Sequence, residues 1–76
     1  MKGKSVFDKF KPYFRYSKLL KESDPTISAR ISLFAIENLK DAYKQNKNVF
    51  SDDERKTFMA EISEYNQIKD LEMASQ

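Results

Sequence analysis

Apolar residues recur with a helical period through the middle of the chain. They stand three or four positions apart at Ile27, Ile31, Phe34, Ala35, Leu39 and Ala42, with Leu33, Ile36 and Tyr43 beside them. Asp24 can cap the free backbone N–H groups before this stripe, and Pro25 suits a first helical turn. Asn46 tolerates a left-handed conformation and Lys47 suits the negative end of a helix dipole, so both are typical of a helix end. The pattern predicts a helix from Pro25 to about Asn46.

A second stripe follows in the C-terminal part of the chain. Ser51 and Glu54 have the spacing of a capping box, and Asp52 and Asp53 add negative charge to the first turn, where the helix dipole favours it. The apolar positions that follow are Phe58, Ile62, Tyr65, Ile68 and Leu71. We therefore expect a helix that begins at Ser51.

The N-terminal third has a less regular pattern. After Pro12, the apolar face holds Tyr13, Tyr16, Leu19 and Leu20. Another face is basic and holds Lys11, Arg15, Lys18 and Lys21. Pro12 either opens this helix or kinks it, because proline lacks the backbone N–H group. A short preceding turn, with Ser5 and Asp8 as a capping box, is a further alternative.

Two short connections join the three expected helices, so neighbouring helices must run antiparallel. The sequence therefore predicts an all-α fold, an antiparallel up-down-up three-helix bundle. We divide the chain into a basic N-terminal segment, residues 1–11, and a single three-helix domain, residues 12–76. One Gly and two Pro favour long helices over a turn-rich β fold. No apolar run approaches the roughly 18 residues of a membrane span, so we expect no transmembrane segment.

The residue types limit the available chemistry. The chain has no Cys and no His, which removes disulfides, thiolate chemistry, imidazole catalysis and the usual zinc sites. Asp52 and Asp53 resemble a cation site, but their place behind Ser51 is explained by capping. No Gly-rich loop is present to hold a phosphate. We expect a non-enzyme that binds no metal and no cofactor directly.

Charge is segregated along the chain. The balance is +5 in residues 1–22, +1 in residues 23–49 and −4 in residues 50–76. Two interpretations follow. The two ends complement one another across the bundle, or the basic end meets an acidic partner such as a protein, a nucleic acid or an anionic lipid surface.

Aromatic rings are abundant for so small a core, with six Phe and four Tyr. Bases alternate with rings from Phe7 to Tyr16, a composition that also suits stacking on single-stranded nucleic acid. Because such binders usually present their rings on open sheets, we favour a core role and expect no nucleic-acid partner. The surplus rings indicate loose packing, a channel, or a face for another protein.

Two segments resemble the LYR-motif (Complex 1 LYR-like) family. The segment from Arg15 to Ser23 is similar to the family's opening, a Leu-Tyr-Arg triplet followed by an apolar pair and a base. In this chain Arg15 replaces the Leu and Ser17 replaces the Arg. The segment from Asp41 to Val49 is similar to the end of the family's second helix. The resemblance covers roughly residues 13–72, and it is strongest to the accessory subunit of the mitochondrial cysteine desulfurase.

The resemblance implies a non-catalytic mitochondrial adaptor. Family members bind an acidic acyl carrier protein, whose acyl-phosphopantetheine enters a channel between the helices, and the pair stabilises a client. That client is the iron-sulfur cluster cysteine desulfurase or a respiratory complex. The implied carrier-binding bases are Arg15, Lys18, Lys21, Lys40 and Lys44. The implied channel residues are Tyr16, Leu20, Ile31, Phe34, Leu39, Tyr43, Phe58 and Ile62.

Two alternatives remain open. A supernumerary structural subunit of a respiratory-chain complex would use the same fold without a carrier. A small helical DNA-associated or regulator-binding protein is the second alternative, and the acidic C-terminal third argues against it.

Overall fold

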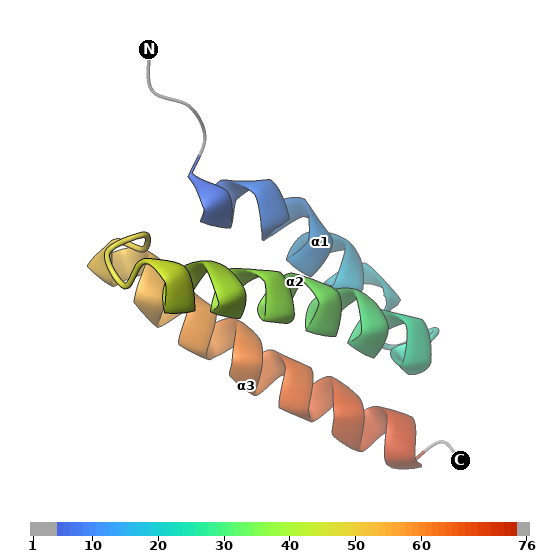
Figure 1. The fold of residues 1–76 in the computed structure, drawn as a ribbon. Coiled ribbons are helices and arrows are strands. Elements are labelled where there is room, and N and C mark those ends of the chain that lie inside the picture. Colours follow the sequence, from blue (N-terminus) through green and yellow to red (C-terminus); the bar gives the residue numbers. More distant parts are fainter. Residues whose placement is uncertain (1–4, 75–76) are drawn as a thin grey trace.

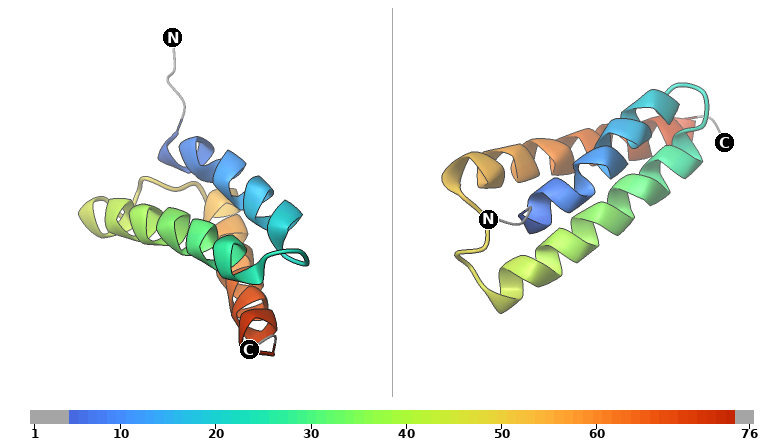
Figure 2. Two further views of the ribbon diagram at one scale, coloured as in Figure 1. Left: turned by 90° about the vertical axis from the view of Figure 1, so that its right-hand side faces the viewer. Right: turned by 90° about the horizontal axis from the view of Figure 1, so that it is seen from above.

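The computed structural model describes residues 5–74, which form three helices that alternate in direction. They are α1 (Val6–Leu20), α2 (Pro25–Gln45) and α3 (Asp52–Ala74). Both α1 and α3 pack mainly against α2 (Figures 1 and 2). The prediction of an all-α up-down-up three-helix bundle is therefore confirmed.

The first helix begins earlier than the boundary placed at Pro12. Ser5 is its N-cap, and the Ser5 hydroxyl accepts a hydrogen bond of 3.1 Å from the backbone N–H of Asp8. Pro12 lies inside α1. Phe7 in the first turn is only 1% exposed, and its burial compensates for the backbone hydrogen bond that proline cannot make. Residues 5–11 thus belong to the domain, and residues 1–4 of the expected basic segment lie outside the described residues.

The other two helices start where the capping residues predict. The Asp24 carboxylate accepts a hydrogen bond of 3.2 Å from Ile27 N–H, with Pro25 at the first helical position. Ser51 and Glu54 form a reciprocal capping box, with bonds of 3.1 and 3.0 Å. The end of α2 differs from expectation, because Asn46 is extended, with φ of −151°, rather than left-handed.

The hydrophobic core lies where α1 begins and α2 ends. Its buried members are Phe7, Phe14, Ala35, Ile36, Leu39 and Phe50. Phe50, from the connection before α3, is central, because its ring lies edge-on to Phe7 at 5.7 Å and stacks on Tyr43 at 5.8 Å. Phe58 and Ile62 of α3 pack against the same cluster. We call this region the aromatic core.

Towards the other end of the bundle, α1 and α2 meet through serines. Ser17 donates a hydrogen bond of 2.8 Å to the Ser28 carbonyl, and Ser28 donates one of 2.6 Å to the Ser17 carbonyl. The hydroxyls of Ser17 and Ser32 lie 2.6 Å apart. All three side chains are buried, and no buried side-chain N or O within residues 5–74 lacks a partner. We call this contact the serine seam.

Candidate functional site

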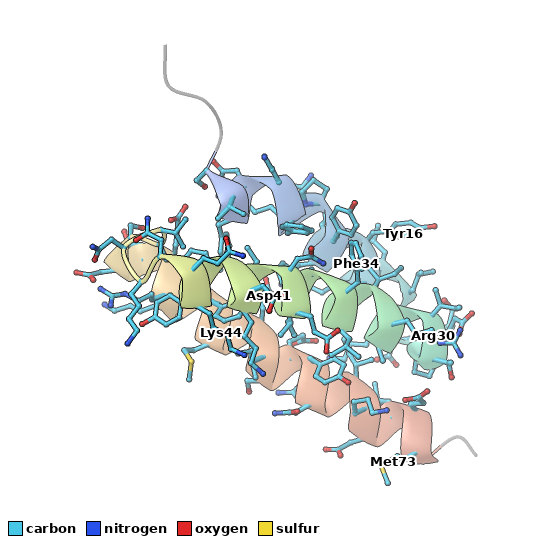
Figure 3. All side chains as sticks on the ribbon, in the orientation of Figure 1. Tyr16, Arg30, Phe34, Asp41, Lys44 and Met73 are labelled. Carbon is cyan, nitrogen blue, oxygen red and sulfur yellow. The ribbon has the colours of Figure 1, made fainter. Side chains whose placement is uncertain are left out.

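Large apolar side chains lie exposed where α1 and α2 run side by side. Tyr13 is 40% exposed, Tyr16 55% and Phe34 52%. Phe10, Tyr13 and Phe34 form a triangle of rings with centroids 5.2 to 6.2 Å apart. Ile31 joins them, and Figure 3 shows Tyr16 and Phe34 on the same side of the molecule. We call these five residues, Phe10, Tyr13, Tyr16, Ile31 and Phe34, the aromatic face.

The serine seam explains why these rings stay outside. The inward positions of α1 and α2 beside the face are small, namely Ser17, Ser28, Ser32 and Ala35. Small residues let two helices approach closely and leave no volume between them for a ring. The neighbouring large side chains therefore remain on the rim of the α1–α2 contact.

A shallow apolar depression lies within the aromatic face. Pro12, Tyr13 and Tyr16 of α1 line it on one side, and Ile31 of α2 lines it on the other. Exposed apolar groups that adjoin one another, rather than standing singly, are typical of surfaces that bind another molecule. The depression is therefore the candidate apolar binding site on this face.

The eight residues expected to line an acyl channel lie in two separate places. Leu39 is in the aromatic core, and Tyr43, Phe58 and Ile62 pack against that core. Tyr16, Ile31 and Phe34 belong instead to the aromatic face. Leu20 is half-buried. The structure therefore brings three of the eight together at the surface and places four others in or against the aromatic core.

The five bases expected to bind a carrier are also divided. Lys18 pairs with Glu61 at 3.2 Å, and Lys21 pairs with Glu64 at 2.7 Å. Arg15, Lys40 and Lys44 are exposed, and within residues 5–74 no ion pair is recorded for them. Figure 3 places Lys44 far along α2 from Tyr16. The bases therefore do not form a single patch.

Polar contacts join α1 to α3 along their length. The Ser5 hydroxyl donates a hydrogen bond of 2.9 Å to the Glu54 carboxylate, and the pairs Lys18–Glu61 and Lys21–Glu64 follow. The hydrogen bond and charge of Glu64 raise the pKa of Lys21, although partial burial acts in the opposite direction. We call this row the charged seam. Two bases of the basic end thus pair with two acids of the acidic end across the bundle, as the first interpretation of the charge pattern expects.

The charged seam has a partial signal in the sequence, and the aromatic face has none. Lys18 and Lys21 stand three residues apart, as do Glu61 and Glu64, which is the spacing of neighbours on a helix surface. The exposure of Tyr16 and Phe34 had no such signal, because their spacing matches that of core positions.

The side chains of the described residues also limit the kinds of chemistry that the site can perform. No group of three or more His, Cys, Asp or Glu side chains in residues 5–74 is arranged to hold a metal ion. None of the three helices, over the described range, has the length and apolar character of a membrane crossing. The buried serine hydroxyls bond to one another and to carbonyl groups, rather than to a base that would activate them.

The aromatic face and the charged seam both include α1, on different sides of that helix. The face offers apolar contact area, and the seam holds two of the bases of α1. Comparisons of the chain with protein-family models, with curated proteins and with solved structures found no match.

Proposed function

We propose that this chain is a non-catalytic helical adaptor that binds an acidic acyl carrier protein and stabilises a client. The aromatic face is the observation that carries the proposal. Burying a Phe-sized side chain is worth about 1.5–3 kcal/mol, yet Tyr16 and Phe34 keep about half of their surface in water. A partner that covers them recovers this free energy.

The charge of α1 supports an acidic partner. Within Val6–Leu20 the bases are Lys9, Lys11, Arg15 and Lys18, against the single acid Asp8. A basic surface attracts an acidic protein and speeds its association, more strongly at low salt. The resemblance to LYR-motif proteins points to an acyl carrier protein in particular. The mitochondrial location and the client, a cysteine desulfurase or a respiratory complex, follow from that resemblance alone.

The acyl chain of the carrier, in this proposal, enters the depression between Tyr13, Tyr16 and Ile31. The space between the three helices is less suitable, because Ala35 and Leu39 are 0% exposed and pack within the aromatic core. An acyl chain on the aromatic face would cover the rings that the serine seam leaves outside. Acylated carrier is therefore expected to bind more tightly than carrier with a bare phosphopantetheine arm.

Native mass spectrometry and calorimetry with purified acyl carrier protein test the proposal. We expect a 1:1 complex with wild-type chain, and a loss of about tenfold or more in affinity for the double variant Tyr16→Ala, Phe34→Ala. The matched control is Met59→Ala, Met73→Ala, because these side chains are 66% and 67% exposed but lie on α3. The control is expected to bind like wild type.

Two results would contradict the proposal. In the first, the 9.0 kDa chain forms no complex with acylated carrier and none with unacylated carrier. In the second, the two double variants lose equal affinity, which would show that the aromatic face is not the binding surface. Incorporation into a respiratory complex without any carrier would favour a structural subunit instead.

A further inference from the structure

Lys18 of α1 and Lys21, the C-cap residue that follows this helix, are held by two glutamates of α3 in matching register. Lys18 and Lys21 are three residues apart, and so are Glu61 and Glu64, and each lysine donates a hydrogen bond to its own glutamate. The pairs are partly shielded from water, because the Glu61 side chain is 12% exposed and that of Glu64 26%. The two carboxylates of α3 thus reach the two lysines through their side chains, while both helices pack mainly on α2.

An acidic partner that uses these lysines would need the same contacts. Lys18 and Lys21 are already neutralised by α3, so carboxylates from outside must replace Glu61 and Glu64. We propose that Glu61 and Glu64 are an internal competitor for the acidic partner, which α3 gives up when the partner binds. This inference rests on the proposed function. It specifies the partner's recognition element as a helix with two carboxylates three residues apart.

The exchange requires only side chains to move. The backbone of α3 is held on both sides of the two glutamates, because Phe58, Ile62 and Tyr65 pack against the aromatic core and Ile68 is 0% exposed. The lysine side chains are more accessible, because that of Lys18 is 51% exposed and that of Lys21 25%. Exposed side chains change rotamer readily, so the lysines can turn from the glutamates of α3 to carboxylates of a partner while the helices stay in place.

Removing the internal acids tests the competition directly. The variant Glu61→Gln, Glu64→Gln frees both lysines and is expected to bind acyl carrier protein about three- to tenfold more tightly than wild type at low salt. The matched control, Asp53→Asn, Asp70→Asn, removes two charges from exposed positions of the same helix. It is expected to change affinity by less than about twofold, because those carboxylates lie outside the charged seam.

The converse variant and a distance measurement guard against effects on folding. Lys18→Gln, Lys21→Gln is expected to bind about tenfold more weakly, with unchanged circular dichroism. Because the chain has no Cys, Leu19→Cys and Met73→Cys accept two spin labels at defined places on α1 and α3. The distance between these labels is expected to stay the same when the carrier binds, because the exchange moves side chains and not helices.

The outcomes separate this inference from the proposed function. If wild type binds the carrier and Glu61→Gln, Glu64→Gln binds with equal or lower affinity, the internal competition is wrong and the adaptor proposal stands. A changed label distance in the complex would show that α3 itself moves, which overturns an exchange of side chains alone. If neither wild type nor this variant binds, both proposals fail together.

Discussion

At one end of the bundle the helices meet through aromatic rings, and at the other they meet through serine hydroxyls. Phe7, Phe14 and Phe50 fill the first contact, whereas Ser17, Ser28 and Ser32 make the second. Burial of rings is worth more free energy, and it does not depend on direction. Hydroxyl pairs contribute less but require close approach and fixed geometry. The first contact therefore supplies most of the stability, and the second sets the helix spacing that leaves Tyr16 and Phe34 outside.

The largest expected effect is a difference in the free energy of unfolding between alanine variants of two phenylalanines, Phe7 and Phe34. Phe7→Ala removes a ring that is 1% exposed and is expected to cost about 3–5 kcal/mol in the free energy of unfolding. Phe34→Ala removes a ring that is 52% exposed and is expected to cost less than about 1 kcal/mol. Urea unfolding followed by circular dichroism measures both. Equal losses would show that the aromatic face contributes to the core.

A smaller effect is expected at the serine seam. Ser17→Ala leaves the Ser32 hydroxyl without its Ser17 partner in a buried place, at a cost of about 1–2 kcal/mol. Ser63→Ala is the matched control, because Ser63 is exposed on α3 and its loss is expected to lie within about 0.5 kcal/mol. The same unfolding experiment applies. A seam variant as stable as wild type would mean that hydroxyl pairing does not hold α1 to α2.

The smallest effects concern pH. Lys21 and Lys69 donate hydrogen bonds to the carboxylates of Glu64 and Glu72, which raise the pKa of both lysines. Their stabilisation is therefore complete below the ordinary value of 10.5 and is lost as pH rises through the raised values. Lys11 lowers the pKa of Asp8, whose stabilisation is present above 3.8 and is lost as pH falls through the lowered value. Melting temperatures are expected to fall at both extremes.

Single variants assign these pH effects to regions of the molecule. Lys21→Gln is expected to reduce the alkaline decrease in melting temperature and to leave the acid decrease unchanged. Asp8→Asn is expected to do the reverse, because Asp8 lies in the first turn of α1, beside the aromatic core. If Lys21→Gln leaves the alkaline decrease intact, the ion pair with Glu64 does not contribute to stability.

Local signals predicted the helix starts, and non-local packing decided the remaining features. Asp24 and the pair Ser51 and Glu54 cap their own helices, so their roles are readable from spacing alone. For α1 the sequence offers two starts, at Pro12 and at Ser5, and local signals do not decide between them, because the burial of Phe7 depends on Phe50, which is distant in sequence.

The solvent exposure of the rings of the aromatic face could not be predicted from the sequence. Tyr16 and Phe34 have the spacing of core residues, and only the small residues on the facing helix determine that they stay outside. The charge segregation predicted attraction between the ends of the chain, but the pairing of Lys18 with Glu61 depends on how α1 and α3 are aligned. That alignment is set by the packing of both helices on α2.

A single carboxylate joins the beginnings of the first and last helices. Glu54 closes the capping box of α3 through one oxygen and accepts the hydroxyl of Ser5 through the other, across a sequence separation of 49 residues. The ribosome therefore makes the first helix long before it makes Glu54, which supplies this contact to Ser5. Until Glu54 has been synthesised, the Ser5 hydroxyl lacks this contact, so the opening turn of α1 is completed only after α2 has been made.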